Sequence, residues 1–279
     1  MKPRFSGERR VPLGRPWLLG GRFPVFRAVL ALIAMQIRRF FLEEPLDVPG
    51  ACLSLSAGES LHALRVLRLK AGDRLQLLNG RGEKAECVLV SGGEGRSCRE
   101  AVCRVLSCQR LAPPAVSPVL LVAPPRGKAF DLVLKASVEL GFSAIQPILC
   151  SYGVSRPEEL GGGWRETLVG ALKQSGNPHL PALRPPLPFR QALQEHGNPS
   201  ALFGASPGAE ATARRRLSPA AARGCQALWV GPEGGFSPEE EGELLQAGVL
   251  PVTLGSSILR VETAVPALMG CLLGVASLA

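Results

Sequence analysis

Two short segments hold the residues best suited to chemistry, and each begins where an apolar strand ends. The first, residues 229–240, reads WVGPEGGFSPEE, a strand followed by a turn rich in glycine and proline. Ser237 and Glu240 are spaced as a capping box, which predicts a helix start after the turn. The turn glycines would let the backbone approach a ligand closely. The segment predicts either a ligand-binding turn or an ordinary tight strand-to-helix connection.

The second segment, residues 254–264, reads LGSSILRVETA and again leads from a strand through a loop to a helix. Its Arg260 and Glu262 have apolar neighbours, where an unpaired charge would be expensive. They form either a structural ion pair or a site arginine with an orienting carboxylate. Neither segment contains the G-x-x-x-x-G-K-[ST] pattern of a P-loop or the G-x-G-x-x-G pattern of dinucleotide-binding folds.

The elements before residue 109 are short and strand-like. We predict strands at residues 39–42, 73–78, 86–91 and 101–108 and a short helix at residues 60–66. Several short strands within about 75 residues are typical of a small barrel. Residues 109–118, QRLAPPAVSP, contain three prolines and are predicted to be a linker.

Strands alternate with helices from Val119 onward. We predict strands at residues 119–123, 144–150, 201–205, 228–230 and 252–254, and helices at residues 128–140, 164–174 and 262–273. This alternation predicts an α/β domain with a mainly parallel sheet, whose ligands bind at the carboxyl ends of the strands.

The two segments together resemble the ribosomal RNA small-subunit methyltransferase E family, whose signature is GPEGGFS followed by LGxxILRxETA. Further matches to the family are the stretches Arg38–Phe41, His62–Leu69, Glu139–Gly141 and Gln174–Gly176. The resemblance covers about residues 35–279 and leaves residues 1–34 without a counterpart.

This resemblance implies the fold class and the activity. The fold would be α/β: a small PUA-like β-barrel for RNA binding at residues 35–108, the linker at 109–118, and a SPOUT domain at 119–279 whose parallel sheet is threaded into a trefoil knot. The activity would be methylation of N3 of a uridine in 16S ribosomal RNA, with S-adenosylmethionine as cofactor. The family's working form is a dimer, so the partners would be small-subunit ribosomal RNA or the 30S subunit and a second copy of the chain, in the cytoplasm.

The resemblance and the chemistry of the side chains give three groups of site residues. The cofactor-binding group comprises Phe203, Gly204, Val230, Gly231, Pro232, Gly234, Gly235, Leu254, Gly255, Ile258 and Leu259. The catalytic group comprises Arg260 as electrostatic stabiliser, with Glu262 or Glu233 as orienting carboxylate or proton acceptor. The RNA-binding group comprises Arg38, Arg39, His62, Arg65, Arg68 and Lys128. Each of these basic residues could instead be an ordinary solvated charge.

Three departures from the family pattern fall on the expected RNA side. The family's Gln-Lys is replaced by Lys135-Ala136, its Ser-Glu-Arg by the stretch Cys150–Gly153, and an arginine by Asn177. Two alternatives therefore stay open: methylation of another rRNA or tRNA nucleotide, and a non-catalytic RNA-binding factor for ribosome assembly.

The net charge of +9 favours an anionic partner, but most of it lies at the start of the chain. Residues 1–34 carry a net +6, residues 35–118 a net +3, and residues 119–279 a net charge of zero. The basic leader is compatible with a transit peptide, a secretory signal, or a translated leader ahead of a native start at Met35. We favour the last, because the organised pattern begins there.

Membrane and metal chemistry are not expected. The longest nearly apolar run, Ala264–Ala279, is shorter than the roughly 20 residues a membrane span needs, so a core helix is predicted. The eight cysteines contain no C-x-x-C pair and the three histidines are scattered, so no zinc site is predicted. Free thiols in a reducing compartment are expected.

Overall fold

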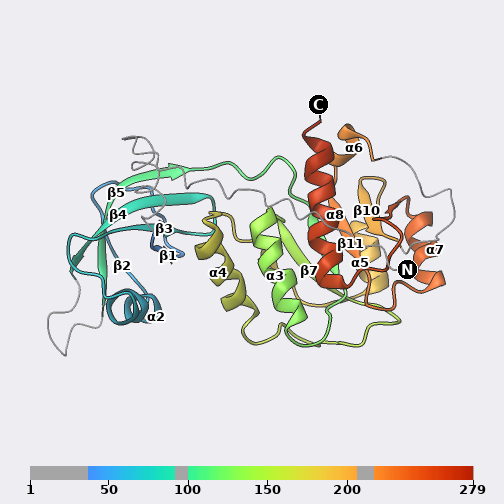
Figure 1. Cartoon of the computed structure of the whole chain (residues 1–279), viewed down its shortest axis with the longest axis horizontal. Helices are drawn as coiled ribbons and strands as arrows, with labels where there is room; N and C mark the ends of the chain where they lie inside the picture. Colours follow the sequence, from blue (N-terminus) through green and yellow to red (C-terminus); the bar gives the residue numbers. More distant parts are fainter. Residues whose placement is uncertain (1–36, 92–99, 206–216, 279) are drawn as a thin grey trace, which may run out of the picture. The chain divides into compact units, whose positions relative to one another are not determined.

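The computed structural model describes residues 37–91, 100–205 and 217–278 (Figure 1). Residues Arg38–Ala279 form one compact unit. The basic leader predicted for residues 1–34 lies outside the described residues. The domain boundaries at 35–108, 109–118 and 119–279 stay predictions, although the strand that ends the first domain continues two residues into the predicted linker.

The first domain is built on a sheet of five strands within the described part of the chain. Its strands are β1 (Arg39–Phe41), β2 (Cys52–Ser54), β3 (Arg74–Leu78), β4 (Glu83–Ser91) and β5 (Val102–Arg110), in the order β1-β3-β4-β5-β2. The pairing of β1 with β3 is parallel and the others are antiparallel. Alternate residues of β4 are buried, as expected for strands with one face on a core. That core includes Phe40, Leu75 and Leu77.

The helical segment of this domain starts earlier than the sequence predicts. Instead of one helix over 60–66, α2 (Ala57–Leu61) runs directly into a π-helical segment, η1 (His62–Val66). Ser56 is the N-cap, and its hydroxyl accepts a hydrogen bond from the backbone N–H of Glu59 at 3.3 Å. A serine three residues before a glutamate is the signal that marks this start.

The second domain is an α/β domain with a parallel sheet. Its strands are β6 (Val119–Val122), β7 (Ala144–Leu149), β8 (Ala182–Leu183), β9 (Leu187–Pro188), β10 (Ala201–Gly204), β11 (Ala227–Val230) and β12 (Leu250–Val252). The sheet order is β12-β10-β11-β6-β7-β8, with β9 also pairing β7, and these strand pairs are all parallel among the described residues. The prediction of a parallel α/β sheet is confirmed; the trefoil knot stays a prediction.

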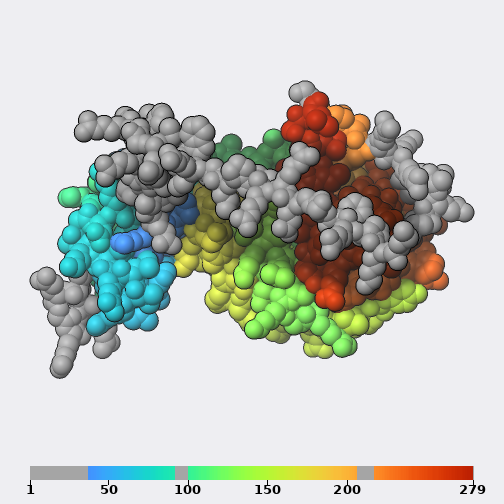
Figure 2. Space-filling model, in the orientation of Figure 1, coloured from blue at the N-terminus to red at the C-terminus, as the bar shows by residue number. Residues whose placement is uncertain are grey.

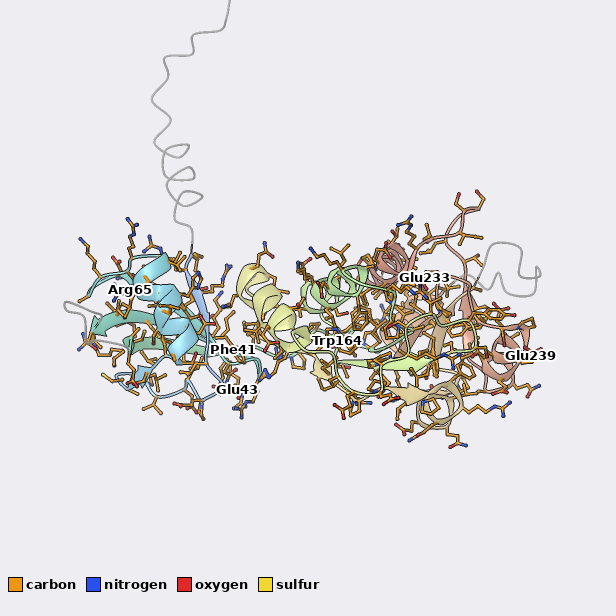
Figure 3. The ribbon with its side chains drawn as sticks, turned by 90° about the horizontal axis from the view of Figure 1, so that it is seen from below. Phe41, Glu43, Arg65, Trp164, Glu233 and Glu239 are labelled. Atoms are coloured by element: carbon orange, nitrogen blue, oxygen red, sulfur yellow. The ribbon has the colours of Figure 1, made fainter. Side chains whose placement is uncertain are left out.

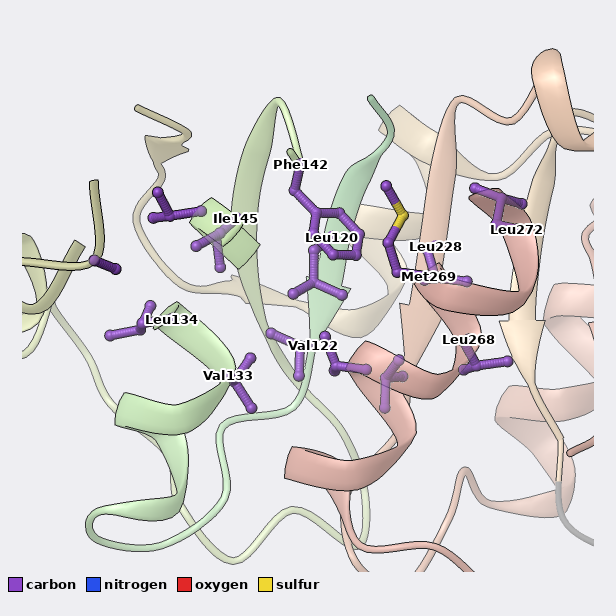
Figure 4. Packing of buried hydrophobic residues seen from close by; sticks show 14 of the residues in the cluster. Leu120, Val122, Val133, Leu134, Phe142, Ile145, Leu228, Leu268, Met269 and Leu272 are labelled. Carbon is purple, nitrogen blue, oxygen red and sulfur yellow. The ribbon is translucent and has the colours of Figure 1, made fainter. Parts of the chain in front are cut away.

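The helices lie on both faces of this sheet. They are α3 (Ala129–Leu140), α4 (Trp164–Ser175), α5 (Phe189–His196), α6 (Pro219–Arg223), α7 (Pro238–Gln246) and α8 (Val261–Ala276). Successive strand residues point to opposite faces, so Leu228 packs in the cluster that contains residues of α3, α4 and α8 (Figure 4), and Trp229 in the cluster that contains residues of α5 and α7. The outer side of α8 reaches the molecular surface, where it is red in Figure 2.

The predicted boundaries of the last strand and of the final helix differ from those in the structure. The last strand was expected at residues 252–254, but β12 is Leu250–Val252 and includes Pro251. A proline lacks the N–H needed in a central strand, and β12 tolerates it because it lies at the edge of the sheet. The final helix, expected at 262–273, extends over Val261–Ala276, as a core helix packed on α3 and α6.

No helix among the described residues is long and apolar enough to span a membrane. The same residues contain no group of three or more side chains suited to a metal ion.

The cysteines of the first domain allow a test of its core. The seven cysteines that the structure describes are all free thiols. Burial raises the pKa of both Cys87 and Cys103 to about 12, and for Cys87 the nearby Cys103 adds to the effect. Thiolate is the reactive form, so these two side chains are protonated and enclosed at neutral pH.

We therefore expect iodoacetamide at pH 8 to label the exposed Cys52 in the folded protein and to leave Cys87 and Cys103 unlabelled. All three should react after unfolding in guanidinium. Peptide mass spectrometry measures both outcomes, and label on Cys87 in the folded protein would contradict the packing described here.

Candidate active site

The carboxyl ends of three neighbouring strands converge on one pocket. Strands β12, β10 and β11 are adjacent in the sheet, and all run in the same direction. Their chains leave the sheet after Val252, Gly204 and Val230. This is the position at which open parallel sheets bind ligands.

The pocket has a volume of about 240 Å³. The strand ends and the turn after β11 contribute Gly204, Ala205, Val230, Gly231, Pro232, Glu233, Gly234, Gly235 and Val252. The loop after β12 and the start of α8 contribute Leu254, Ser257, Ile258, Leu259, Val261, Ala264 and Leu268. Apolar walls with one carboxylate and several glycines make a site for a mostly apolar molecule that carries a positive charge.

The turn after β11 needs its glycines for steric reasons. A Cβ on Gly231 would lie 3.1 Å from the backbone nitrogen of Phe236 and 3.2 Å from the carbonyl carbon of Gly235, so the turn closes on itself there. Gly235 has φ of +77°, in the left-handed region that favours glycine. The sequence LWVGPEGG therefore folds into a turn whose backbone forms the pocket wall.

Gly235→Ala is expected to destabilise the protein by about 1 kcal/mol, because a side chain at positive φ is strained. Gly242→Ala is the matched control: Gly242 lies in α7, a Cβ there meets nothing within 4 Å, and alanine favours a helix over glycine by about 1 kcal/mol. Urea unfolding of the two variants should give free energies of unfolding that change in opposite directions. Equal changes would contradict the strain at Gly235.

The capping box predicted at Ser237 is present, and its Glu240 also binds a second segment of the chain, which the sequence does not indicate. The hydroxyl of Ser237 accepts from the backbone N–H of Glu240 at 3.2 Å, and the Glu240 carboxylate accepts from the backbone N–H of Ser237 at 2.9 Å. The second oxygen of Glu240 accepts from the backbone N–H and the hydroxyl of Ser151, at 2.7 and 3.1 Å. One buried carboxylate thus joins the pocket turn to the loop after β7.

Of the three predicted catalytic residues, Glu233 lines the pocket, whereas Arg260 and Glu262 are chain neighbours of residues that line it. Arg260 stands between Leu259 and Val261, which both line it, and its Nη1 is 3.9 Å from Oε1 of Glu262. The expectation of an apolar setting is wrong for Arg260, whose side chain is 84% exposed, but holds for Glu262 at 18%. Glu233 lines the pocket and is exposed (labelled in Figure 3). The arginine is therefore free to turn toward a ligand.

Nine of the eleven predicted cofactor residues line the pocket; Phe203 and Gly255 do not. The Phe203 side chain is 2% exposed and packs edge-to-face on Phe236, with ring centroids 6.2 Å apart. It therefore packs against the pocket turn through Phe236. Gly255 lies in the loop after β12 with φ of +70°.

Arg39 is occupied by contacts within the chain. Its guanidinium donates to the side-chain oxygen of Gln76 at 3.1 Å and to the backbone carbonyls of Lys173 and Gln174 at the end of α4, at 3.3 and 3.1 Å. Arg39 therefore ties β1 to α4. Arg38, next to it, pairs with Asp73 at 3.7 Å and is 42% exposed.

The other predicted RNA-binding residues lie in two places. His62, Arg65 and Arg68 belong to η1 and the turn after it, and the two arginines are exposed (Arg65 is labelled in Figure 3). The His62 ring packs edge-to-face on Phe40, with centroids 5.9 Å apart. Lys128 is exposed at the start of α3, in the second domain.

The sequence does not predict several of the pocket residues, because they lie on elements that come close to one another only in the folded chain. Val261, Ala264 and Leu268 lie on α8, and the apolar run Ala264–Ala279 predicts a core helix rather than a pocket wall. Val252 was included in a predicted strand. The apolar residues of α8 predict that the helix is buried, but they do not predict which element it faces.

Two families match the chain. The model described as an RNA methyltransferase domain matches residues 113–273, and the model described as an RNA methyltransferase PUA domain matches residues 55–97. The first domain is therefore PUA-like.

Two curated relatives bear the name ribosomal RNA small subunit methyltransferase E. The protein from Mycobacterium bovis is 31% identical over 245 residues, which cover 84% of this chain and 91% of the relative. The protein from Synechocystis is 29% identical over 227 residues, which cover 79% of this chain and 72% of the relative.

A solved structure agrees with these relatives. It is a ribosomal RNA small subunit methyltransferase E from Neisseria gonorrhoeae bound to S-adenosyl methionine, with 28% identity and a TM-score of 0.74, covering 86% of this chain and 98% of the other. A family model matches more than half of the chain, and a relative above 30% identity covers most of it. This chain belongs to the ribosomal RNA small-subunit methyltransferase E family.

Proposed function

We propose that the protein transfers a methyl group from S-adenosylmethionine to N3 of a uridine in small-subunit ribosomal RNA. The observation that carries the proposal is the pocket itself: a glycine turn and an apolar wall meet at the ends of β10, β11 and β12, and the exposed Arg260 lies between the lining residues Leu259 and Val261. The family membership supports the RNA as substrate, and the relative from Neisseria gonorrhoeae binds S-adenosyl methionine.

The pocket residues fit S-adenosylmethionine. The faces of its adenine ring are flat and suited to apolar contact, which fits the walls made by Val230, Leu254 and Leu268. Its sulfonium is a cation, and none of the described residues that line the pocket carries a positive charge. Ile258 lines the pocket but is 78% exposed, so a ligand that covers it gains apolar burial.

The cofactor supplies an electrophilic methyl group, and the protein must supply alignment and charge stabilisation. Uracil N3 carries a proton at neutral pH and belongs to the Watson–Crick edge, so the base must be unpaired or flipped out. Negative charge then develops on O2, N3 and O4. Arg260 offers a permanently charged, planar donor fork for two of these atoms.

The carboxylates have separate parts in this proposal. Glu262, held 3.9 Å from Arg260 and mostly buried, orients the guanidinium. Glu233 is exposed at the pocket and free to accept the N3 proton. The helix start at Val261 does not use the Arg260 side chain as a cap, so that side chain is available for substrate.

The RNA would also contact the first domain through Arg65 and Arg68, which are exposed. Phosphate contacts of this kind make binding fall steeply with salt. We further propose a homodimer as the working form, which light scattering of the purified protein tests directly.

One experiment tests the proposed function. Purified protein is incubated with S-adenosylmethionine carrying a labelled methyl group and with small ribosomal subunits from cells that lack the modification. The label is then mapped by mass spectrometry of RNA digests. Label on N3 of a single uridine is expected; label on another base or on ribose would reassign the target, and RNA binding without transfer would favour an assembly factor.

A further inference from the structure

Tyr152 is the one tyrosine in the chain, and it stands at the edge of the pocket. Its side chain is 51% exposed, and it is the only aromatic among the exposed large apolar residues of the described ranges. The aromatic rings of Phe203, Trp229 and Phe236 are buried in the core nearby. An aromatic ring exposed to solvent loses the favourable free energy of apolar burial, which a binding partner that covers the ring would restore.

The ring leans on the pocket turn. A Cβ on Gly234 would lie 3.2 Å from the Cβ of Tyr152 and 3.7 Å from its Cγ and Cδ2, so the tyrosine packs against the backbone that lines the pocket. Gly234 follows Glu233, the exposed carboxylate of the site. Tyr152 thus borders the pocket without belonging to its lining.

The turn that carries Tyr152 is fixed by buried and charged partners. Glu240 binds both the backbone N–H and the hydroxyl of Ser151. On the other side, Arg156 donates to the carbonyls of Ser151 and Cys150, at 3.2 and 3.4 Å. The ring is therefore presented to solvent by an ordered backbone, which lowers the entropy lost when something stacks on it.

We propose that Tyr152 is a stacking platform for an unpaired base of the RNA substrate at the mouth of the methyl-transfer pocket. The inference rests on the proposed function. Single-stranded bases are recognised by stacking on aromatic side chains, and a base held beside the pocket needs one ordered face to lie on. Tyr152 is then a positioning and affinity determinant, distinct from Arg260, whose proposed part is to stabilise charge on the reacting base.

The test compares Tyr152→Ala, Tyr152→Phe and the wild type in methyl transfer to RNA. We expect Tyr152→Ala to raise KM for RNA about tenfold or more, in line with the worth of one base–aromatic stack. Tyr152→Phe should restore KM, because stacking needs the ring and not the hydroxyl. The Kd for S-adenosylmethionine, measured by calorimetry without RNA, should stay within about twofold.

Val154→Ala is the matched control, because Val154 is 48% exposed on the same loop. It should leave KM for RNA unchanged. A KM for RNA unchanged in Tyr152→Ala, or a parallel loss of S-adenosylmethionine affinity, would overturn the assignment while leaving wild-type transfer intact. Absence of transfer by the wild type would instead overturn the proposed function.

Discussion

Arg260→Ala is expected to lower kcat for methyl transfer by a factor of about 10² to 10³, the usual cost of removing one donor that stabilises a developing negative charge. The folded state should be little affected. The side chain is 84% exposed, and it is the backbone carbonyl of Arg260 that accepts from Thr263 and Ala264 at the start of α8. The Kd for S-adenosylmethionine should therefore stay close to that of the wild type.

Arg190→Ala is the matched control for this prediction. Arg190 is 80% exposed and pairs with Glu243 at 2.9 Å, so Arg190→Ala also loses a surface ion pair, but on α5, which contributes no residue to the pocket. Arg260→Lys adds a second comparison, because lysine keeps the charge but lacks the planar fork. The expected order of kcat is wild type, then Lys, then Ala, from single-turnover rates; an Arg260→Ala enzyme as fast as Arg190→Ala would remove Arg260 from the mechanism.

Local patterns in the sequence predict one part of the candidate site, and the arrangement of strands determines the rest. Local signals placed the turn after β11, because Ser237 and Glu240 satisfy a capping box within four residues. The two segments with chemistry meet because β10 lies between β11 and β12 in the sheet, an order that no local pattern contains. The resemblance to the family predicts that the two segments line one cofactor site, but it does not give the strand order; the parallel sheet is confirmed.

Contacts between residues far apart in the sequence explain the remaining differences between the predictions and the structure. Arg39 was predicted to contact RNA, yet its guanidinium is held by carbonyls more than 130 residues away. Phe203 was predicted to touch the cofactor, but in a strand its side chain points to the face where Phe236 packs. Helix α5 was missed, since its first residue, Phe189, becomes a core residue only beside Trp229.

Glu240→Ala is expected to lower the free energy of unfolding by about 2–4 kcal/mol. Its carboxylate is buried and accepts from the backbone N–H groups of Ser237 and Ser151, which would both lose their partner. A buried donor left unpaired costs about 1–3 kcal/mol; the hydrogen bond of the Ser237 N–H is buried, whereas that of the Ser151 N–H is only partly buried and its loss costs less. Because the substitution also frees the turn that carries Tyr152, KM for RNA should rise in the surviving folded protein. Urea unfolding and methyl-transfer kinetics measure the two effects.

Two further variants separate the carboxylate's geometry from its charge. Glu239→Ala removes the same charge from the same helical turn, but Glu239 is exposed, so the loss of stability should be much smaller. Glu240→Gln keeps one acceptor oxygen, enough for Ser237 or for Ser151 but not for both sides, and should be intermediate. If Glu240→Ala were as stable as Glu239→Ala, the carboxylate would not join the pocket turn to the loop after β7, and the ordered presentation of Tyr152 would need another cause.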